Sequence, residues 1–210
     1  MTDVTSKHTF RSTTIQALID EAVQFTLETA IYPLLVPRFA GAGVYLLYYS
    51  GKYVDYRFLV ERNSKTEDPH PIYVGKAVPP GWRSARQATN TTQVSNKLYS
   101  RINQHRRSIE QVANLDVENF SCRFAILEGQ ESDLISTLEA AFIRRYKPLW
   151  NTQIDGFGNH DPGKGRYEQA PSEWDTLHPG RTWAARLNGT PPYLATIKTG
   201  IVQYFNTTDW

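Results

Sequence analysis

The stretch AGVYLLYYS, residues Ala42–Ser50, constrains the fold of this chain more than any other. It is dense in aromatic and β-branched residues and has glycines at both ends, which predicts a β-strand. Tyr53–Leu59 is interpreted as an extension of this hairpin. Pro71–Gly75 predicts a second strand, and the alternating apolar residues of Asn119–Glu128 predict a third.

Apolar residues at helical spacing predict three helices. The first covers Thr13–Leu35 and ends near Pro33, and the second covers Leu98–Val112. The third covers Ser132–Lys147, where Ser132 caps the N-terminus and a proline follows the last turn. The remainder is rich in glycine, proline and tryptophan, and a last strand is expected near Leu194–Phe205.

Composition excludes several classes of protein. A chain of 210 residues is long enough for one domain with a real core. Its single cysteine, Cys122, excludes an intramolecular disulfide and favours a reducing compartment. The sequence has no signal-like N-terminus and no run of about 18 apolar residues, so we expect a cytoplasmic protein without a membrane span.

Positive charge is concentrated in one part of the chain, although the net charge is only +2. The segment 76–107 contains no Asp or Glu. Its positive residues are Lys76, Arg83, Arg86, Lys97, Arg101, Arg106 and Arg107. Such a segment is typical of a polyanion partner, and a solvated basic surface is the equally compatible alternative.

Two tyrosines occupy the predicted strands, in the tripeptides Gly43-Val44-Tyr45 and Tyr73-Val74-Gly75. If the two strands are antiparallel neighbours, both phenols can face one cleft. A strand tyrosine is more often simply part of the core or surface, so this pair alone is weak evidence for a site.

Three further side chains suit phosphate chemistry. Arg101 and His105 are four residues apart and share one helical face, where a guanidinium can bind an oxyanion and an imidazole can exchange a proton. Glu139 lies at the edge of the apolar face of its helix, where a carboxylate is costly unless it is paired or binds a metal. The alternatives are a solvated basic stripe and a structural ion pair.

These features, in this order, resemble the motifs of the GIY-YIG nuclease superfamily over about residues 41–153. The matching positions are Gly43-Val44-Tyr45, Tyr73-Val74-Gly75, Arg101, His105, Glu139 and Asn151. The resemblance implies an α+β fold in which helices flank a small central three-stranded antiparallel sheet. It also implies a metal-dependent deoxyribonuclease.

The resemblance assigns a catalytic role to each of these side chains. Glu139 would hold one Mg²⁺, which Mn²⁺ can replace, and Tyr45 would be the general base for the attacking water. Tyr73, Arg101 and His105 would orient and neutralise the phosphate. Asn151 would brace the site.

The spacing of the motifs departs from the simplest family members, in which a tight hairpin joins the two tyrosine motifs. Residues 46–72 separate Tyr45 from Tyr73 here, and residues 76–100 separate Gly75 from Arg101. The chain is therefore most similar to the GIY-YIG type II restriction endonucleases. The expected organisation is an N-terminal helical extension at 1–40, a nuclease core at 41–153 with insertions at 50–71 and 76–97, and a C-terminal extension at 154–210 for DNA contact or dimerisation.

No separate DNA-binding domain is visible, so we expect recognition residues within the nuclease itself. Arginine reads guanine edges, and asparagine or glutamine reads adenine. The candidates are Lys76, Arg83, Arg86, Gln87, Asn90, Gln93, Asn96, Lys164 and Arg166, with Arg181 and Arg186 as further possibilities. The expected partners are double-stranded DNA at a GC-rich palindrome, a second copy of the chain, and a cognate DNA methyltransferase in the same cell.

Three alternatives remain open from the sequence. The first is a repair or homing-type nuclease that cuts one strand or a branched structure. The second is a catalytically inactive DNA-binding module, against which the intact set of motifs argues. The third is an RNA-processing nuclease.

Overall fold

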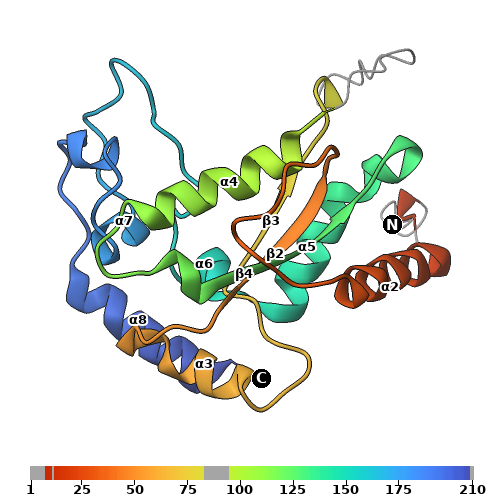
Figure 1. The fold of residues 1–210 in the computed structure, drawn as a ribbon, viewed down its shortest axis with the longest axis horizontal. Coiled ribbons are helices and arrows are strands. Elements are labelled where there is room, and N and C mark those ends of the chain that lie inside the picture. Colours follow the sequence, from red (N-terminus) through yellow and green to blue (C-terminus); the bar gives the residue numbers. More distant parts are fainter. Residues whose placement is uncertain (1–7, 11, 83–94, 209–210) are drawn as a thin grey trace, which may run out of the picture.

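The computed structural model describes residues 8–10, 12–82 and 95–208. Four antiparallel strands form one sheet in the order β1-β4-β2-β3, with helices packed around it (Figure 1). The strands are β1 (Tyr32–Pro33), β2 (Gly43–Tyr49), β3 (Tyr73–Ala77) and β4 (Phe120–Ile126). The predicted α+β class is confirmed, and the sheet has one strand more than the three predicted.

Strand β2 lies at the centre of the sheet and all seven of its residues are buried. It pairs with β3 on one side, Tyr45 opposite Gly75, and with β4 on the other, Tyr45 opposite Phe124. Because successive side chains point to opposite faces, Tyr45 and Leu47 enter one apolar cluster and Val44 enters the other. This two-sided burial explains why the strand is apolar along its whole length.

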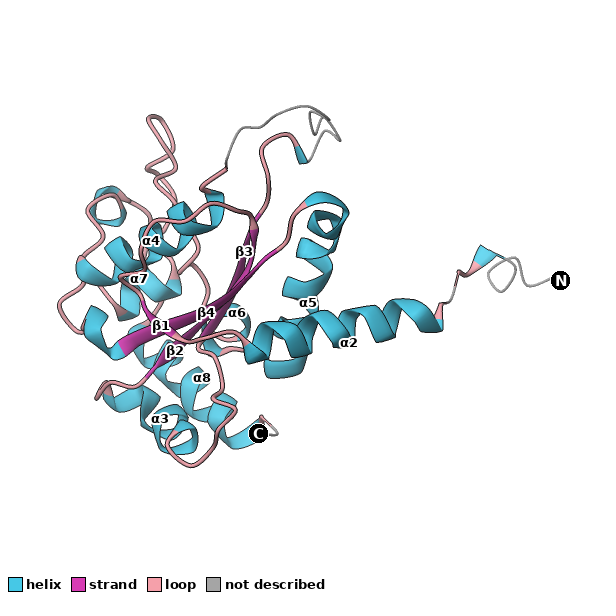
Figure 2. Ribbon diagram, turned by 45° about the vertical axis from the view of Figure 1, so that its right-hand side comes forward, coloured by secondary structure: helices cyan, strands magenta, loops and turns pink. Residues whose placement is uncertain are grey.

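Helices cover both faces of the sheet. They are α2 (Thr13–Glu28), α3 (Arg57–Asn63), α4 (Lys97–Glu110), α5 (Ile135–Tyr146), α6 (Leu149–Thr152), α7 (Glu173–Leu177) and α8 (Leu194–Thr207). Helices α2 and α5 pack on the face of Val44, and α4, α6, α7 and α8 contribute to the cluster of Tyr45 (Figure 2). Within the described residues, no helix is long and apolar enough to cross a membrane.

The N-terminal helix is shorter than predicted. Helix α2 ends at Glu28, and Tyr32 and Pro33 form the edge strand β1, paired with β4. The Tyr32 ring stacks on Phe124, with 5.8 Å between centroids. Pairing with the sheet therefore overrides the apolar spacing that continues through Ile31, and proline is tolerated because the strand is at the edge.

Two predicted strands are wrong. Residues 53–59 form a 3₁₀ turn, Val54–Tyr56, and the start of α3 rather than an extended hairpin. Residues 194–207 form α8, which buries Ile197, Ile201 and Tyr204 against the rest of the core. Their spacing is helical, although the segment is rich in β-branched residues.

The other helices agree with the sequence apart from one cap. Helix α4 begins one residue before its predicted range and ends inside it, and α5 lies within its range but begins at Ile135 after a 3₁₀ turn, Gly129–Leu134. Ser132 therefore does not cap α5, and its hydroxyl donates to the carbonyl of Gly129. Further 3₁₀ turns cover Val117–Asn119 and Ala184–Arg186.

Candidate active site

The Tyr45 side chain crosses the sheet toward β3 and passes over Gly75. The two residues are direct partners in the β2–β3 ladder. A Cβ atom on residue 75 would come within 2.2 Å of the Tyr45 hydroxyl. Glycine at this position therefore provides the space that the phenol occupies, which is a physical reason for the Tyr-Val-Gly motif on β3.

The Tyr45 hydroxyl meets His105 of α4, with 2.6 Å between the oxygen and Nε2. Both side chains are buried. Burial, and next the charge of Arg101, lower the pKa of His105 well below its ordinary value, so the imidazole is neutral near pH 7. A neutral imidazole has one nitrogen free to accept a proton.

Aromatic rings hold His105 and the two tyrosines in one cluster. The Tyr73 centroid lies 6.3 Å from that of Tyr45 and 5.1 Å from that of His105. The Phe157 ring stacks on His105 at 4.4 Å and meets Tyr73 edge-on at 4.9 Å. The structure thus brings together both motif tyrosines and His105, with Phe157 as a fourth member that the sequence did not indicate.

Arg101 lies one turn before His105 on α4 and is held by a loop of the C-terminal part of the chain. Its Nη2 donates to the carbonyl of Gly158 at 2.9 Å, and its Nη1 lies 2.5 Å from Nε2 of His160. Its charge acts on the phenols of Tyr45 and Tyr73, opposing the effect of burial on their pKa values. A Cβ atom on residue 158 would lie 3.4 Å from Nη2 of Arg101 and 2.9 Å from the Tyr73 hydroxyl, so the guanidinium lies close to that phenol.

Glu139 of α5 reaches the edge strand β3, where its Oε2 lies 2.6 Å from Nζ of Lys76. The Glu139 side chain is 21% exposed. Burial is the largest cause that raises the pKa of Tyr45 and of Tyr73, and the negative charge of Glu139 raises both further. The sequence raised the alternative of an ion pair with an arginine, and the structure pairs Glu139 with a lysine.

Asn151 of α6 is bonded to the backbone of β3. Its Oδ1 accepts from the Val74 amide at 2.7 Å, and its Nδ2 donates to the Val74 carbonyl at 2.8 Å. The side-chain amide thus pairs with the outer edge of β3 as a neighbouring strand would. It holds in place the strand that carries Tyr73.

The pKa of Tyr45 lies above its ordinary value although the cation of Arg101 is nearby. Burial raises it well above its ordinary value, and the neighbouring Tyr73 raises it further. Arg101 lowers it by less, and Lys76 is engaged with Glu139 instead. Tyr45 is therefore a protonated phenol in the free protein.

The candidate DNA-binding residues fall into three groups. Arg83, Arg86, Gln87, Asn90 and Gln93 lie outside the described residues. Lys164 and Arg166 are exposed on the loop after His160. Lys76 and Asn96 have partners within the chain, since Asn96, with its amide oriented to satisfy both groups, donates to the Phe39 carbonyl at 3.0 Å and accepts from Arg38 at 2.9 Å.

Two further candidates have internal partners. Arg181 is 1% exposed and ion-paired with Asp175, so a direct contact with DNA is wrong for this residue. Arg186 is exposed but lies 2.5 Å from Asp161, and its guanidinium packs over Tyr167. Both partner carboxylates, Asp175 and Asp161, precede their arginines in the same segment, and this was the available signal in the sequence.

The loop of residues 156–160 was not indicated by the sequence. Phe157, Gly158 and His160 contact the predicted site residues, and a Cβ atom on residue 158 would come within 2.9 Å of the Tyr73 hydroxyl. Isolated glycines and a histidine in an irregular segment give no periodic signal. Only the tertiary fold shows that this loop forms one wall of the site.

Among the described residues, no three His, Cys, Asp or Glu side chains gather to form a metal cage. Among the described carboxylates, Glu139 is the one whose charge acts on both Tyr45 and Tyr73. One carboxylate, together with waters and phosphate oxygens, is a donor set that Mg²⁺ accepts. The residues present therefore fit a magnesium ion that is completed by the substrate.

A helix-flanked antiparallel sheet with two facing strand tyrosines and an Arg–His pair on the neighbouring helix defines a GIY-YIG nuclease. The family model described as the Eco29kI GIY-YIG domain matches residues 37–205, and the chain belongs to this family. Eco29kI is a type II restriction endonuclease, so the chain is a nuclease that acts on DNA. No curated protein matches the chain.

Proposed function

We propose that this chain is a type II restriction endonuclease that hydrolyses both strands of DNA at a specific sequence and requires Mg²⁺. The observation that carries the proposal is the buried contact of the Tyr45 hydroxyl with His105, beside Arg101. It unites a proton acceptor, a hydroxyl and a cation in one place. Phosphodiester hydrolysis requires these three kinds of group.

Tyr45 and His105 act together on the attacking water. The water gives a proton to the Tyr45 oxygen while the Tyr45 hydroxyl proton passes to Nε2 of His105, and the water oxygen forms the new bond to phosphorus. The bond from phosphorus to the leaving deoxyribose oxygen then breaks, and this oxygen takes up a proton from solvent water. Because His105 takes the proton, no free phenolate has to form.

Arg101 and Tyr73 bind the scissile phosphate. The guanidinium neutralises the charge that develops on the phosphate oxygens, and its contacts with Gly158 and His160 fix its direction before DNA binds. Tyr73 donates from its hydroxyl to a phosphate oxygen. Both groups are placed before the reaction, so they need not reorganise during it.

Glu139 would be the protein ligand of a magnesium ion. The ion supplies charge neutralisation at the phosphate and the leaving oxygen. Lys76 is the present partner of Glu139, and it is free to contact a DNA phosphate when the carboxylate binds the metal. Mn²⁺ accepts the same oxygen ligands and is expected to replace Mg²⁺.

The expected binding partners of the chain can be inferred from cleavage of both DNA strands. Two copies of the chain are expected on a palindromic site, because two-fold symmetry of the protein mirrors that of the DNA. The arginines among the candidate recognition residues favour a GC-rich site. A cognate methyltransferase would protect the host DNA, and the lone Cys122 agrees with a cytoplasmic location.

The test is to digest plasmid and genomic DNA with the protein and Mg²⁺ and to sequence the ends. A type II enzyme gives discrete fragments whose ends share one short palindrome. Nicked circles or cuts confined to branched DNA would instead favour a repair or homing-type nuclease. The absence of any cleavage in Mg²⁺ or Mn²⁺ would favour an inactive DNA-binding module.

A further inference from the structure

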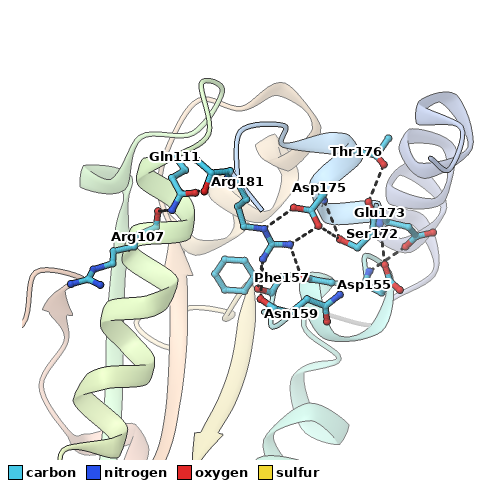
Figure 3. A network of polar contacts seen from close by, with 12 residues as sticks. Arg107, Gln111, Asp155, Phe157, Asn159, Ser172, Glu173, Asp175, Thr176 and Arg181 are labelled. Atoms are coloured by element: carbon cyan, nitrogen blue, oxygen red, sulfur yellow. Dashed lines mark hydrogen bonds and ion pairs between the residues drawn. The ribbon is translucent and has the colours of Figure 1, made fainter. Parts of the chain in front are cut away.

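Arg181 is a fully buried arginine in the segment that follows α7. Its guanidinium forms a two-fold ion pair with Asp175 of α7, with Nε 2.6 Å from Oδ1 and Nη2 2.6 Å from Oδ2 (Figure 3). The indole rings of Trp174 and Trp183 pack against it, each with its centroid 4.6 Å from Cζ. The Ser172 hydroxyl donates to the same carboxylate at 2.7 Å.

The other donors of Arg181 all bind the 156–160 loop. Nη2 donates to the carbonyl of Gly156 at 2.9 Å, and Nη1 donates to the carbonyls of Phe157 at 3.1 Å and Asn159 at 3.3 Å. With the two bonds to Asp175, all five N–H groups of the guanidinium have acceptors. Arg181 therefore fixes the backbone of this loop in one conformation.

The fixed loop is the one that contacts the catalytic side chains. The carbonyls of Phe157 and Asn159 flank Gly158, whose own carbonyl accepts from Arg101. The Phe157 ring stacks on His105. A displacement of the loop would thus move the acceptor of Arg101 and the ring that packs on His105 at the same time.

Arg181 is also anchored to the helix that carries these side chains. The amide of Thr182, the next residue, donates to Oε1 of Gln111 at 3.0 Å, just beyond the C-terminal end of α4. Figure 3 shows the guanidinium between α4 and α7, with the loop carbonyls beside it. The segment thus connects α4, α7 and the wall of the active site.

We propose that Arg181 is a positioning residue for DNA cleavage, which holds the 156–160 loop so that Arg101 and His105 face the scissile phosphate in the reactive geometry. This inference rests on the proposed roles of Arg101 and His105. A purely structural arginine would instead change the stability of the fold without a separate effect on the cleavage step.

The test separates the cleavage rate from DNA affinity and from stability. Cleavage of a supercoiled plasmid is followed with enzyme in excess, and affinity for a linear fragment of that plasmid is measured in Ca²⁺ without cleavage. Arg181→Gln is expected to slow cleavage by about 10- to 100-fold, because small displacements of catalytic groups have effects of this size. The Kd should change by less than about threefold.

Epistasis with Arg101 shows whether Arg181 acts through it. In an Arg101→Lys background, Arg181→Gln should slow cleavage by less than about threefold further, because the group it positions is already impaired. Tyr56→Phe is the matched control. This variant removes a buried hydroxyl that is bonded to His178 and Trp150 and has no polar contact with the 156–160 loop. It should leave the cleavage rate unchanged.

Two further variants keep the test decisive if Arg181→Gln does not fold. Arg181→Lys keeps a charge beside Asp175 but offers fewer donors to the loop, so its rate should lie between those of wild type and Arg181→Gln. Gly158→Ala leaves the buried pair intact and pushes the loop from Tyr73, since its Cβ would lie 2.9 Å from the hydroxyl. It should also slow cleavage at unchanged DNA affinity.

Equal loss from Arg181→Gln in both backgrounds, or an equal loss from Tyr56→Phe at matched thermal stability, would overturn the positioning role. A different result would contradict the proposed function. If Arg101→Lys alone cleaves at the wild-type rate, the role of Arg101 fails. If Arg101→Lys is slow and Arg181→Gln is not, only the role of Arg181 fails.

Discussion

The Tyr45 hydroxyl lies 2.6 Å from Nε2 of His105, although 60 positions separate the two residues in the sequence. The contact joins the central strand to α4 in the part of the core that faces Arg101. A second buried pair, the Tyr56 hydroxyl 2.5 Å from Nε2 of His178, has the same chemistry but contains no motif residue. The same substitution can therefore be made in both tyrosine–histidine pairs, and its effects can be compared.

Gly75→Ala should damage both activity and stability. The new methyl group would lie 2.2 Å from the Tyr45 hydroxyl and 2.5 Å from the ring carbon that bears it. The phenol must then leave its position beside His105, so we expect cleavage to fall at least 100-fold, by analogy with other misplaced catalytic groups. Overpacking should lower the free energy of unfolding by about 1–3 kcal/mol.

Urea unfolding and single-turnover cleavage measure these two effects of Gly75→Ala separately. A variant that retains wild-type cleavage would show that the position of Tyr45 over residue 75 is not needed for the reaction.

Glu139→Gln should abolish cleavage and leave DNA binding intact. The amide has nearly the same shape but lacks the charge with which a carboxylate holds Mg²⁺. Calorimetric titration with Mg²⁺ or Mn²⁺ in the presence of DNA should show a metal-binding event for wild type and none for the variant. Cleavage by Glu139→Gln at the wild-type rate would remove the proposed metal site.

Lys76→Met is the companion variant to Glu139→Gln. It removes the partner of Glu139 and keeps the carboxylate. Metal binding should persist in Lys76→Met, and affinity for DNA should fall modestly with the loss of one phosphate contact. Loss of metal binding in both variants would indicate that the ion pair itself, and not the carboxylate, is required.

The fold should lose stability in acid because buried histidines remain neutral. Burial lowers the pKa of His178 to about 3 and that of His70 to about 3, whereas the unfolded chain titrates near 6.5. Between these values the unfolded state binds more protons. The contribution of these histidines to the free energy of unfolding is therefore complete above pH 6.5. It decreases as the pH falls toward 3, by up to about 1.4 kcal/mol per pH unit for each histidine.

His178→Gln tests this acid dependence. The variant should show a smaller decrease in unfolding free energy between pH 7 and pH 5 than wild type in urea titrations, because one proton-binding group is absent. An unchanged slope would show that His178 does not titrate between the two states.

The sequence predicted the central strand and the helices α4 and α5 because their apolar patterns are regular. The predictions from the sequence were wrong where tertiary contacts determine the secondary structure. The short edge strand β1 exists only because β4 binds it, and α8 was mistaken for a strand because its β-branched residues outweighed its helical spacing.

The same contrast applies to the site. The resemblance to the GIY-YIG motifs indicated Tyr45, Tyr73, Arg101 and His105, and the structure places these four side chains together. The 156–160 loop carries no pattern that a sequence can reveal, since its role depends on backbone carbonyls and on a buried arginine at position 181. Arg181 was expected at the DNA surface because burial cannot be read from charge.

The most direct test compares Tyr45→Phe with Tyr56→Phe, two variants that each remove one oxygen atom from a buried tyrosine–histidine pair. Single-turnover cleavage of plasmid DNA in Mg²⁺ is measured for both, with DNA affinity and thermal stability as controls. The account predicts a loss of several orders of magnitude for Tyr45→Phe and a near wild-type rate for Tyr56→Phe. A loss of less than roughly tenfold for Tyr45→Phe would contradict it, because removal of a group that transfers a proton should cost at least 100-fold.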